Sequence, residues 1–172
     1  IRVKESNDFP PVFTSNSFQG NVVEKQESDK VITRVEAIDK DLQDNTITYT
    51  IVSGNEDGIF MINKQTGEIK VVPGQGKHID YDQKKQFNLL IQATDSHETP
   101  LYGLTMLVIN VRDTNDHPPV FSKPAYSATL PENLAPGHCF LRVEADSRDS
   151  VDRIQYVIAD SKDNQAFSIN QQ

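Results

Sequence analysis

The chain has 172 residues with a formal net charge of −8 at pH 7, and this acidic balance weighs against nucleic-acid binding, which requires a basic surface. Charged residues make up 24% of the chain, with 8 glycines and 9 prolines, a composition typical of a folded domain and not of a low-complexity segment. No apolar run is long enough for a membrane-spanning helix.

Alternating apolar residues predict short β-strands along the first part of the chain. One strand is expected around residues 32–38, and another at 46–51, where Ile47, Tyr49 and Ile51 would share one face. Two apolar segments at 60–62 and 69–71 flank Gln65-Thr66-Gly67. This spacing predicts a hairpin in which Gly67 takes a positive φ angle.

Two longer ladders follow, with apolar residues alternating at 87–93 and at 107–111. Proline pairs at 10–11 and 118–119 fit the entry to an edge strand, where a missing N–H is tolerated. No window of twelve or more residues keeps a helical period. About seven short strands with turn signals between them predict an all-β fold, a Greek-key seven-stranded β-sandwich.

The sequence repeats itself at a spacing of 107 or 108 residues. Residues 5–13 read ESNDFPPVF and residues 113–121 read DTNDHPPVF. The same offset relates Phe18 to Tyr126, Glu24 to Glu132, Asp41 to Asp149, Tyr49 to Tyr156, Phe60 to Phe167 and Ile62 to Ile169. We therefore expect a tandem array with the tail of a preceding repeat at 1–8, a complete repeat at 9–116 and the N-terminal half of the next repeat at 117–172.

Cys139 is the single cysteine, so no internal disulfide is expected and cysteine usage does not decide the compartment. Its neighbours Phe140, Leu141 and Val143 are apolar. The expected state of Cys139 is therefore a buried core thiol.

Acidic and amide side chains gather where the repeats join, and they predict a calcium site. Calcium takes six to eight oxygen ligands in flexible geometry, and aspartates one residue apart can direct carboxylates to one point. Such pairs are Asp39 with Asp41 and Asp80 with Asp82. An EF-hand beginning at Asp39 is excluded because its sixth position is not glycine and its twelfth, Thr50, is not glutamate.

An enzyme is not expected. Asp80 with Asp82, or Asp113 with Asp116, could form an acid–base pair. However, no nucleophile motif, phosphate-binding loop or zinc-ligand spacing accompanies them, and the four histidines are scattered. A small-molecule substrate is accordingly not expected either.

At these residues the chain resembles the extracellular repeats of the cadherin family, over essentially its whole length. The family's linker motif, Asp-x-Asn-Asp-Asn-x-Pro-x-Phe, is matched at 113–121 except at His117. Shorter family motifs are matched in the family's order: the strand-A glutamate at 23–25 and again at 131–133, Ala-x-Asp-x-Asp at 37–41, Leu-Asp-Arg-Glu at 79–82 and the late Ala-x-Asp at 93–95.

The resemblance implies a set of calcium ligands for each junction. At the second junction, two ions would be held by Glu24, Asp80, Asp82, Asp113, Asp116 and the Thr114 carbonyl. A third ion there would use Asn115, the His117 carbonyl and Asp149, and we expect it to be weak or missing because Ser147 stands where the family has aspartate. His117 would offer only its backbone oxygen. At the first junction, one ion would be held by Asn7, the Phe9 carbonyl, Asp39, Asp41, a carbonyl near Asp44, and Asp95.

The resemblance also implies a function: calcium-dependent cell–cell adhesion by an internal ectodomain segment that calcium rigidifies. It implies a location on the extracellular face of the plasma membrane, a single-pass membrane parent, and other cadherins as partners. The alternative is a calcium-independent β-sandwich adhesion or receptor module similar to fibronectin type III. Such a module would need no acidic junctions, so the calcium dependence of stability distinguishes the two.

Overall fold

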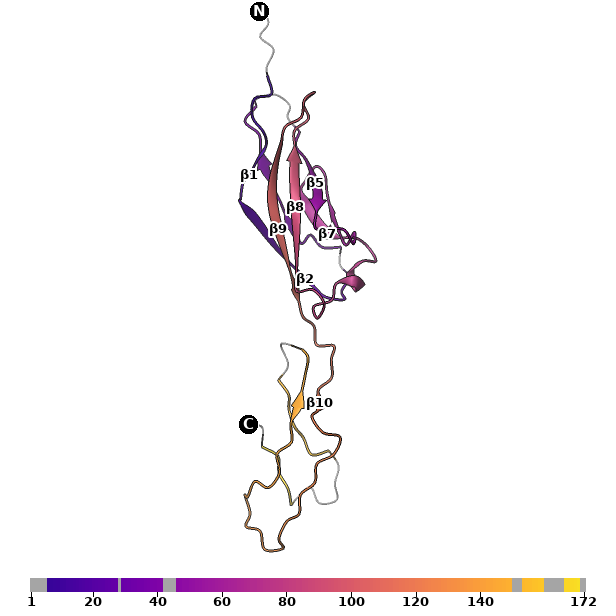
Figure 1. Cartoon of the computed structure of the whole chain (residues 1–172), viewed down its shortest axis with the longest axis vertical. Coiled ribbons are helices and arrows are strands. Elements are labelled where there is room, and N and C mark those ends of the chain that lie inside the picture. The colour runs from indigo at the N-terminus through magenta and orange to yellow at the C-terminus, as the bar shows by residue number, and fades with distance from the viewer. Residues whose placement is uncertain (1–5, 28, 42–45, 150–152, 160–165, 171–172) are drawn as a thin grey trace, which may run out of the picture. The chain divides into compact units, whose positions relative to one another are not determined.

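The computed structural model describes residues 6–27, 29–41, 46–149, 153–159 and 166–170 (Figure 1). The chain divides into two compact units, Ile1–Asp113 and Thr114–Gln172. Across the described residues the regular structure is β-strand, with one short 3₁₀ turn at Gly76–His78. This confirms the all-β class that the alternating pattern predicts.

The first unit contains two sheets that face each other. Strands β2 (Ser17–Val23), β9 (Tyr102–Arg112), β8 (Gln86–Thr94) and β5 (Thr48–Ser53) form a four-stranded sheet in that order. Strands β3 (Thr33–Arg34), β7 (Glu68–Val71) and β6 (Phe60–Ile62) form a three-stranded sheet. Two further short strands, β1 (Val12–Phe13) and β4 (Ala37–Ile38), pair with each other. Strand β2 runs parallel to β9, and every other pair is antiparallel.

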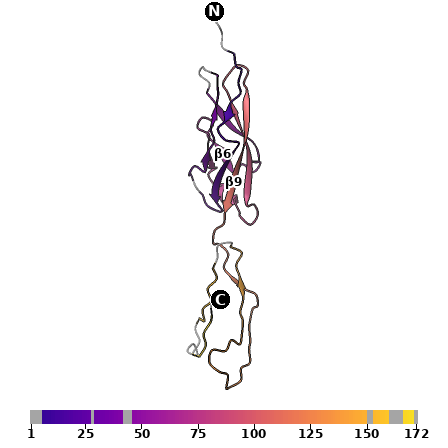
Figure 2. The same ribbon diagram turned by 90° about the vertical axis from the view of Figure 1, so that its left-hand side faces the viewer.

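The core lies between these sheets. Every second residue of the long strands is buried in it, which explains why the segments with alternating apolar residues form strands. Leu89 and Ile91 of β8 and Leu107 and Ile109 of β9 are all 0% exposed. From the other sheet, Phe60 packs edge-on against Phe87 of β8, with ring centroids 5.0 Å apart. Each fully buried side chain of this size contributes about 1.5–3 kcal/mol. Figure 2 shows the first unit from the side, with β6 and β9 belonging to different sheets. The β-sandwich prediction is confirmed.

The segment at 32–38 differs from the single strand that the sequence predicts. It forms two short strands in different sheets, since Thr33–Arg34 pairs with β7 whereas Ala37–Ile38 pairs with β1. Between them, Val35 is fully buried and its N–H donates to the Gly67 carbonyl at 3.0 Å. A chain that passes from one layer of a sandwich to the other must bend, and alternation alone does not reveal a bend.

The predicted hairpin at Gly67 is confirmed. Gly67 has φ of 71°, and a Cβ atom there would lie 2.2 Å from the Val35 carbonyl oxygen. Only glycine satisfies both conditions without displacing the backbone.

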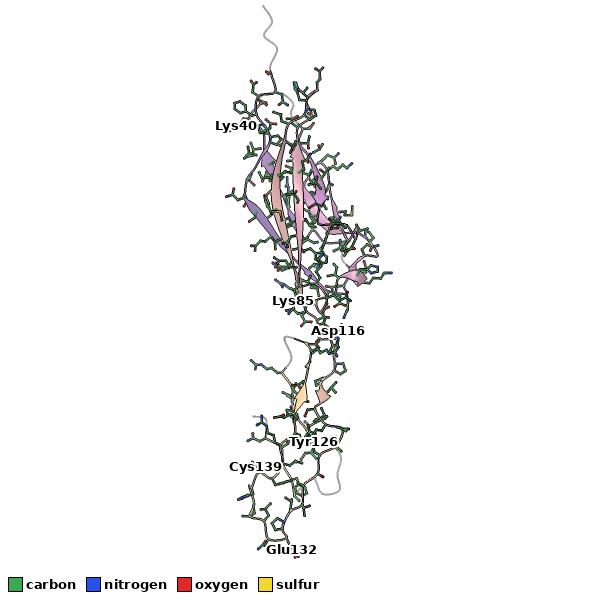
Figure 3. All side chains as sticks on the ribbon, in the orientation of Figure 1. Lys40, Lys85, Asp116, Tyr126, Glu132 and Cys139 are labelled. Carbon is green, nitrogen blue, oxygen red and sulfur yellow. The ribbon has the colours of Figure 1, made fainter. Side chains whose placement is uncertain are left out.

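In the second unit, β10 (Val120–Phe121) pairs with β11 (Ala145–Asp146). Large apolar side chains are exposed here, among them Phe121 at 56% and Val157 at 78%. Cys139 is also exposed, so the predicted buried thiol is wrong. The physical reason is that the described part of this unit holds a single two-stranded ladder, which cannot cover its apolar residues. Figure 3 shows Cys139 on a loop of this unit.

The sequence repeat is also a repeat of atomic contacts. The pair Phe13↔Ala37 has its counterpart in Phe121↔Ala145. The Tyr49 hydroxyl accepts a hydrogen bond from Ala37 N at 3.0 Å, and the Tyr156 hydroxyl accepts one from Ala145 N at 2.9 Å. The second unit therefore begins with the same local structure as the first.

Candidate calcium-binding junctions

The first cluster comprises Asn7, Asp39, Asp41 and Asp95, from three segments of the first unit. Asn7 precedes β1, Asp39 directly follows β4, and Asp95 directly follows β8. Asn7 Nδ2 donates to Asp95 Oδ2 at 3.0 Å, and Asp41 N donates to Asp39 Oδ1 at 2.9 Å. The structure thus brings together residues that lie up to 88 positions apart.

Asp95 is the buried anchor of this cluster, at 3% exposure. Burial by itself raises the pKa of its carboxyl group. Hydrogen bonds from the Asn7 side chain and from the N–H groups of His97 and Leu101 outweigh burial, so the pKa of Asp95 lies below its ordinary value. The carboxylate is therefore ionised at neutral pH.

Two oxygen atoms of the first cluster are buried without a hydrogen-bond partner in the described part of the chain: Asn7 Oδ1 and Asp39 Oδ2. A buried, unpaired polar atom costs about 1–3 kcal/mol, so a native structure rarely keeps one unless something else satisfies it. Amide and carboxylate oxygens are ligands that calcium accepts. These residues therefore fit a calcium ion.

The first cluster also includes the backbone at Phe9, whose N–H donates to Asp41 Oδ2 at 3.1 Å. Asn7 additionally donates to the Thr99 carbonyl at 2.9 Å. The hydrogen bonds from or to Thr99, His97 and Leu101 use backbone atoms. Because almost every residue type has these atoms, the sequence could not indicate these contacts. Asp44, predicted to offer a nearby carbonyl, lies outside the described residues.

The second cluster lies at the end of the first unit where β2 and β9 finish, and it holds Glu24, Asp80, Asp82 and Asp113. Because Val23 pairs with Arg112, Glu24 and Asp113 leave adjacent strands at the same end. Glu24 is 3% exposed and its Oε2 accepts a hydrogen bond from Tyr81 N at 2.8 Å. This bond joins the Glu24 strand to the loop that carries Asp80 and Asp82.

The third cluster belongs to the second unit and comprises Asp116, His117 and Asp149. Asp149 is 6% exposed, and its Oδ2 accepts a hydrogen bond from His117 N at 3.0 Å. The His117 ring nitrogen Nδ1 lies 2.7 Å from Asp116 Oδ1 and 2.9 Å from Asp149 Oδ1. The side chain of His117 thus contacts two carboxylates, whereas the sequence suggests a role for its backbone oxygen alone.

The predicted ligands of the second junction divide between the units. Glu24, Asp80, Asp82 and Asp113 belong to the first, and Thr114, Asn115, Asp116, His117 and Asp149 belong to the second. Within the first unit the Glu24–Tyr81 hydrogen bond joins two of the segments, and within the second unit the ligand atoms of Asp116, His117 and Asp149 lie within 4.8 Å of one another. Their joint use at one junction stays a prediction.

Comparison with known proteins gives the family. Residues 18–112 match the family model for the cadherin domain. The chain belongs to the cadherin family. Protocadherin Fat 2 of Mus musculus is 34% identical over 175 aligned residues, which cover 99% of this chain. Cadherin EGF LAG seven-pass G-type receptor 3 of Mus musculus is 33% identical over 174 residues, which also cover 99% of the chain. The chain spans only 4% and 5% of the length of these two relatives.

Solved structures show the same fold. Extracellular cadherin domains 3–6 of protocadherin gamma B2 match with a TM-score of 0.71 at 25% identity, covering 86% of this chain and 37% of that one. The human desmocollin-1 ectodomain matches with a TM-score of 0.74 at 24% identity, covering 85% of this chain and 28% of that one. Among the described residues no helix is long and apolar enough to span a membrane.

Proposed function

We propose that this chain is an extracellular segment of a cadherin, that calcium rigidifies its junctions, and that it serves calcium-dependent cell–cell adhesion. The observation that carries the calcium assignment is the pair of buried oxygens without partners, Asn7 Oδ1 and Asp39 Oδ2. Both belong to residues that the family motifs mark as ligands, and both lie in a cluster that also holds the ionised Asp95 carboxylate.

The charges of the second junction indicate what calcium would change. Six carboxylates would meet there: Glu24, Asp80, Asp82, Asp113, Asp116 and Asp149. Without cations these carboxylates repel one another, so the linker that carries them is expected to be flexible. Calcium, when bound, supplies positive charge shared among oxygens of both units. The six carboxylates named above would hold the calcium ions, and this shared binding would restrain the two units.

The third cluster differs from the first in a way that favours weaker calcium binding. At the position of Asp39, the second unit has Ser147, whose hydroxyl donates to the His117 carbonyl at 3.4 Å. That oxygen is the one that a third ion would use, and a hydroxyl supplies no negative charge. We therefore assign one ion to the first junction and two to the second, with a weak or missing third ion.

Adhesion and location follow from family membership. We assign the chain to the extracellular side of the plasma membrane, with other cadherins as partners and no catalytic activity. Extracellular calcium modules bind with Kd values of roughly 10⁻⁴–10⁻³ M, so such sites fill outside cells and empty inside them. The parent would be a membrane protein. A single-pass parent stays a prediction, because one relative is named a seven-pass receptor.

Thermal unfolding of the chain in calcium, in magnesium and in chelator tests this proposal. At a calcium concentration of ten times Kd, each occupied site should raise the free energy of unfolding by about 1.4 kcal/mol. This corresponds to a rise in Tm of roughly 5–10 °C for a unit of this size. Magnesium should have little effect, because it demands a tighter octahedral geometry.

Asp39→Ala should remove the part of this shift that the first junction supplies, because it deletes a ligand oxygen without disturbing the core. Asp57→Ala is the matched control, since Asp57 is exposed and belongs to a turn outside all three clusters. A calcium shift equal in both variants would contradict the assignment of Asp39. The absence of any shift in the unaltered chain would favour the calcium-independent adhesion module.

A further inference from the structure

We propose that Asp116, His117 and Asp149 form a binding site for a borderline divalent transition metal, for which Zn²⁺ is the natural ion. The three ligand atoms, Asp116 Oδ1, His117 Nδ1 and Asp149 Oδ1, lie within 4.8 Å of one another. All three residues belong to the second unit. The site shares Asp116 and Asp149 with the proposed calcium ligands, so zinc would bind in place of the weak or missing third calcium ion.

The nitrogen atom decides the class of metal. Calcium and magnesium take oxygen ligands, whereas imidazole suits zinc, copper, nickel and iron. Zinc is commonly held by three protein ligands with water completing a tetrahedron. With metal–ligand distances near 2.0–2.2 Å, neighbouring ligands of a tetrahedral zinc lie about 3.3 Å apart. His117 Nδ1 lies 2.7 Å and 2.9 Å from the two carboxylate oxygens, so a small opening of the cluster would admit the ion.

The cluster is held in position by bonds that metal binding would leave in place. Asp149 Oδ2 accepts a hydrogen bond from His117 N at 3.0 Å, which leaves Oδ1 directed at the ring. Asp149 N donates to the Ser147 hydroxyl at 3.2 Å. The Asp149 side chain is 1% exposed, whereas those of His117 and Asp116 are 30% exposed. The site therefore has one buried ligand, fixed by the backbone, and two ligands on the solvent side. Zinc would replace the Nδ1 proton, which leaves to solvent.

The first unit provides an internal comparison. Phe9 stands at the position of His117, and its N–H donates to Asp41 Oδ2 at 3.1 Å in the same way. Asp8 stands at the position of Asp116. The backbone arrangement is thus repeated, but the phenyl ring offers no ligand atom. At this position a ring nitrogen is therefore available in the second unit and not in the first.

The test is a zinc titration of the metal-free 172-residue chain, with a chromophoric chelator as competitor. A Cys139→Ser background is used throughout, because the exposed thiol is itself a zinc ligand. One Zn²⁺ should bind per chain. His117→Asn should weaken binding at least about tenfold, since loss of a ligand's outer-shell partner alone costs about 10–100-fold. Co²⁺ in place of Zn²⁺ should give a visible absorption spectrum that His117→Asn abolishes.

His138→Asn is the matched control, because His138 is an exposed histidine of the same unit. It should bind zinc as tightly as the background chain. If His117→Asn fails to fold, the ring C–H resonances of His117 in the unaltered sequence should still shift with one equivalent of Zn²⁺. Zinc binding that survives His117→Asn, or that His138→Asn removes, would overturn the proposal, as would the absence of any stoichiometric binding. Zinc binding without calcium stabilisation would support this site and contradict the calcium assignment. Calcium stabilisation without stoichiometric zinc binding would support the calcium assignment and contradict this site.

Discussion

At the scale of single residues, the two repeats use the same backbone contact for different side-chain chemistry. The N–H of Phe9 and the N–H of His117 each donate to a carboxylate 32 positions further along the chain. In the first unit the ring at that position is apolar, and the neighbouring aspartate pair is complete. In the second unit the ring carries nitrogen, and Ser147 replaces one aspartate. Two sequence differences at equivalent positions would therefore change the donor atoms offered there from oxygen alone to nitrogen and oxygen.

Asp95 leads to a prediction at this scale. Its folded-state pKa lies below its ordinary value, and the unfolded pKa of aspartate is about 3.9. The ionised form therefore stabilises the folded state above about pH 4, and this contribution is lost as the pH falls through the folded pKa. Asp95→Asn should destabilise the chain near pH 7, and the difference from the unaltered chain should shrink below pH 4.

Urea denaturation in chelator at several pH values measures that difference. Asp57→Asn, which changes an exposed aspartate, should alter the free energy of unfolding by no more than about 0.5 kcal/mol. An Asp95→Asn penalty that stays constant down to pH 3 would show that the lowered pKa contributes nothing to stability.

At the scale of elements, the strand that changes sheets is the feature that places the first cluster. Thr33–Arg34 belongs to the three-stranded sheet, but Ala37–Ile38 pairs with β1, which brings Asp39 and Asp41 beside Phe9. Gly67 supports the bend, because its carbonyl accepts the Val35 N–H and its missing side chain leaves room for the Val35 carbonyl. A hairpin in one sheet thus helps to direct the ligands of a cluster formed elsewhere.

Gly67→Ala should therefore destabilise the first unit by more than about 1 kcal/mol, because a Cβ atom would meet the Val35 carbonyl and φ is positive. Gly58→Ala is the comparison: Gly58 also has positive φ, at 66°, but a Cβ atom there meets nothing within 4 Å. Chemical denaturation of both variants should show the larger loss for Gly67→Ala. Equal losses would mean that the close approach to Val35 is relieved without penalty.

At the scale of the whole molecule, the chain forms two compact units with matching strand pairs 108 residues apart, and the predicted calcium ligands lie near the point where the units adjoin in sequence. Glu132, the counterpart of Glu24, lies in the second unit at the end away from Asp116 (Figure 3). By its position in the family motif, Asp116 is predicted to serve two ions. The proposed junctions thus use one set of motifs repeatedly, with each unit contributing a different part of the set.

If the junctions act independently, their calcium effects should add. Asp116→Ala should lower the calcium-induced rise in Tm by removing the second junction's share, and Asp39→Ala should remove the share of the first. Because the two residues belong to different compact units, the double variant should lose the sum of the single effects to within about 0.5 kcal/mol. A double variant no worse than Asp116→Ala alone would show that one junction depends on the other.

The sequence by itself determined the fold class and the buried faces of the long strands, and it named the acidic residues of the candidate clusters. Alternation at 87–93 and 107–111 reflects burial on one face, which is a local property of a strand, and both ladders are buried as predicted. The repeat at 107–108 residues likewise survives as matching contacts, because the same residues make the same local bonds.

Tertiary structure alone decided the rest. The bend between Val35 and Ala37, the exposure of Cys139, and the backbone donors that hold Asp95 ionised depend on what lies opposite each residue. The position of the His117 ring between Asp116 and Asp149 has the same origin. Its carboxylate partners include a residue 32 positions away, and a sequence motif records which residue is present but not which atom its side chain reaches.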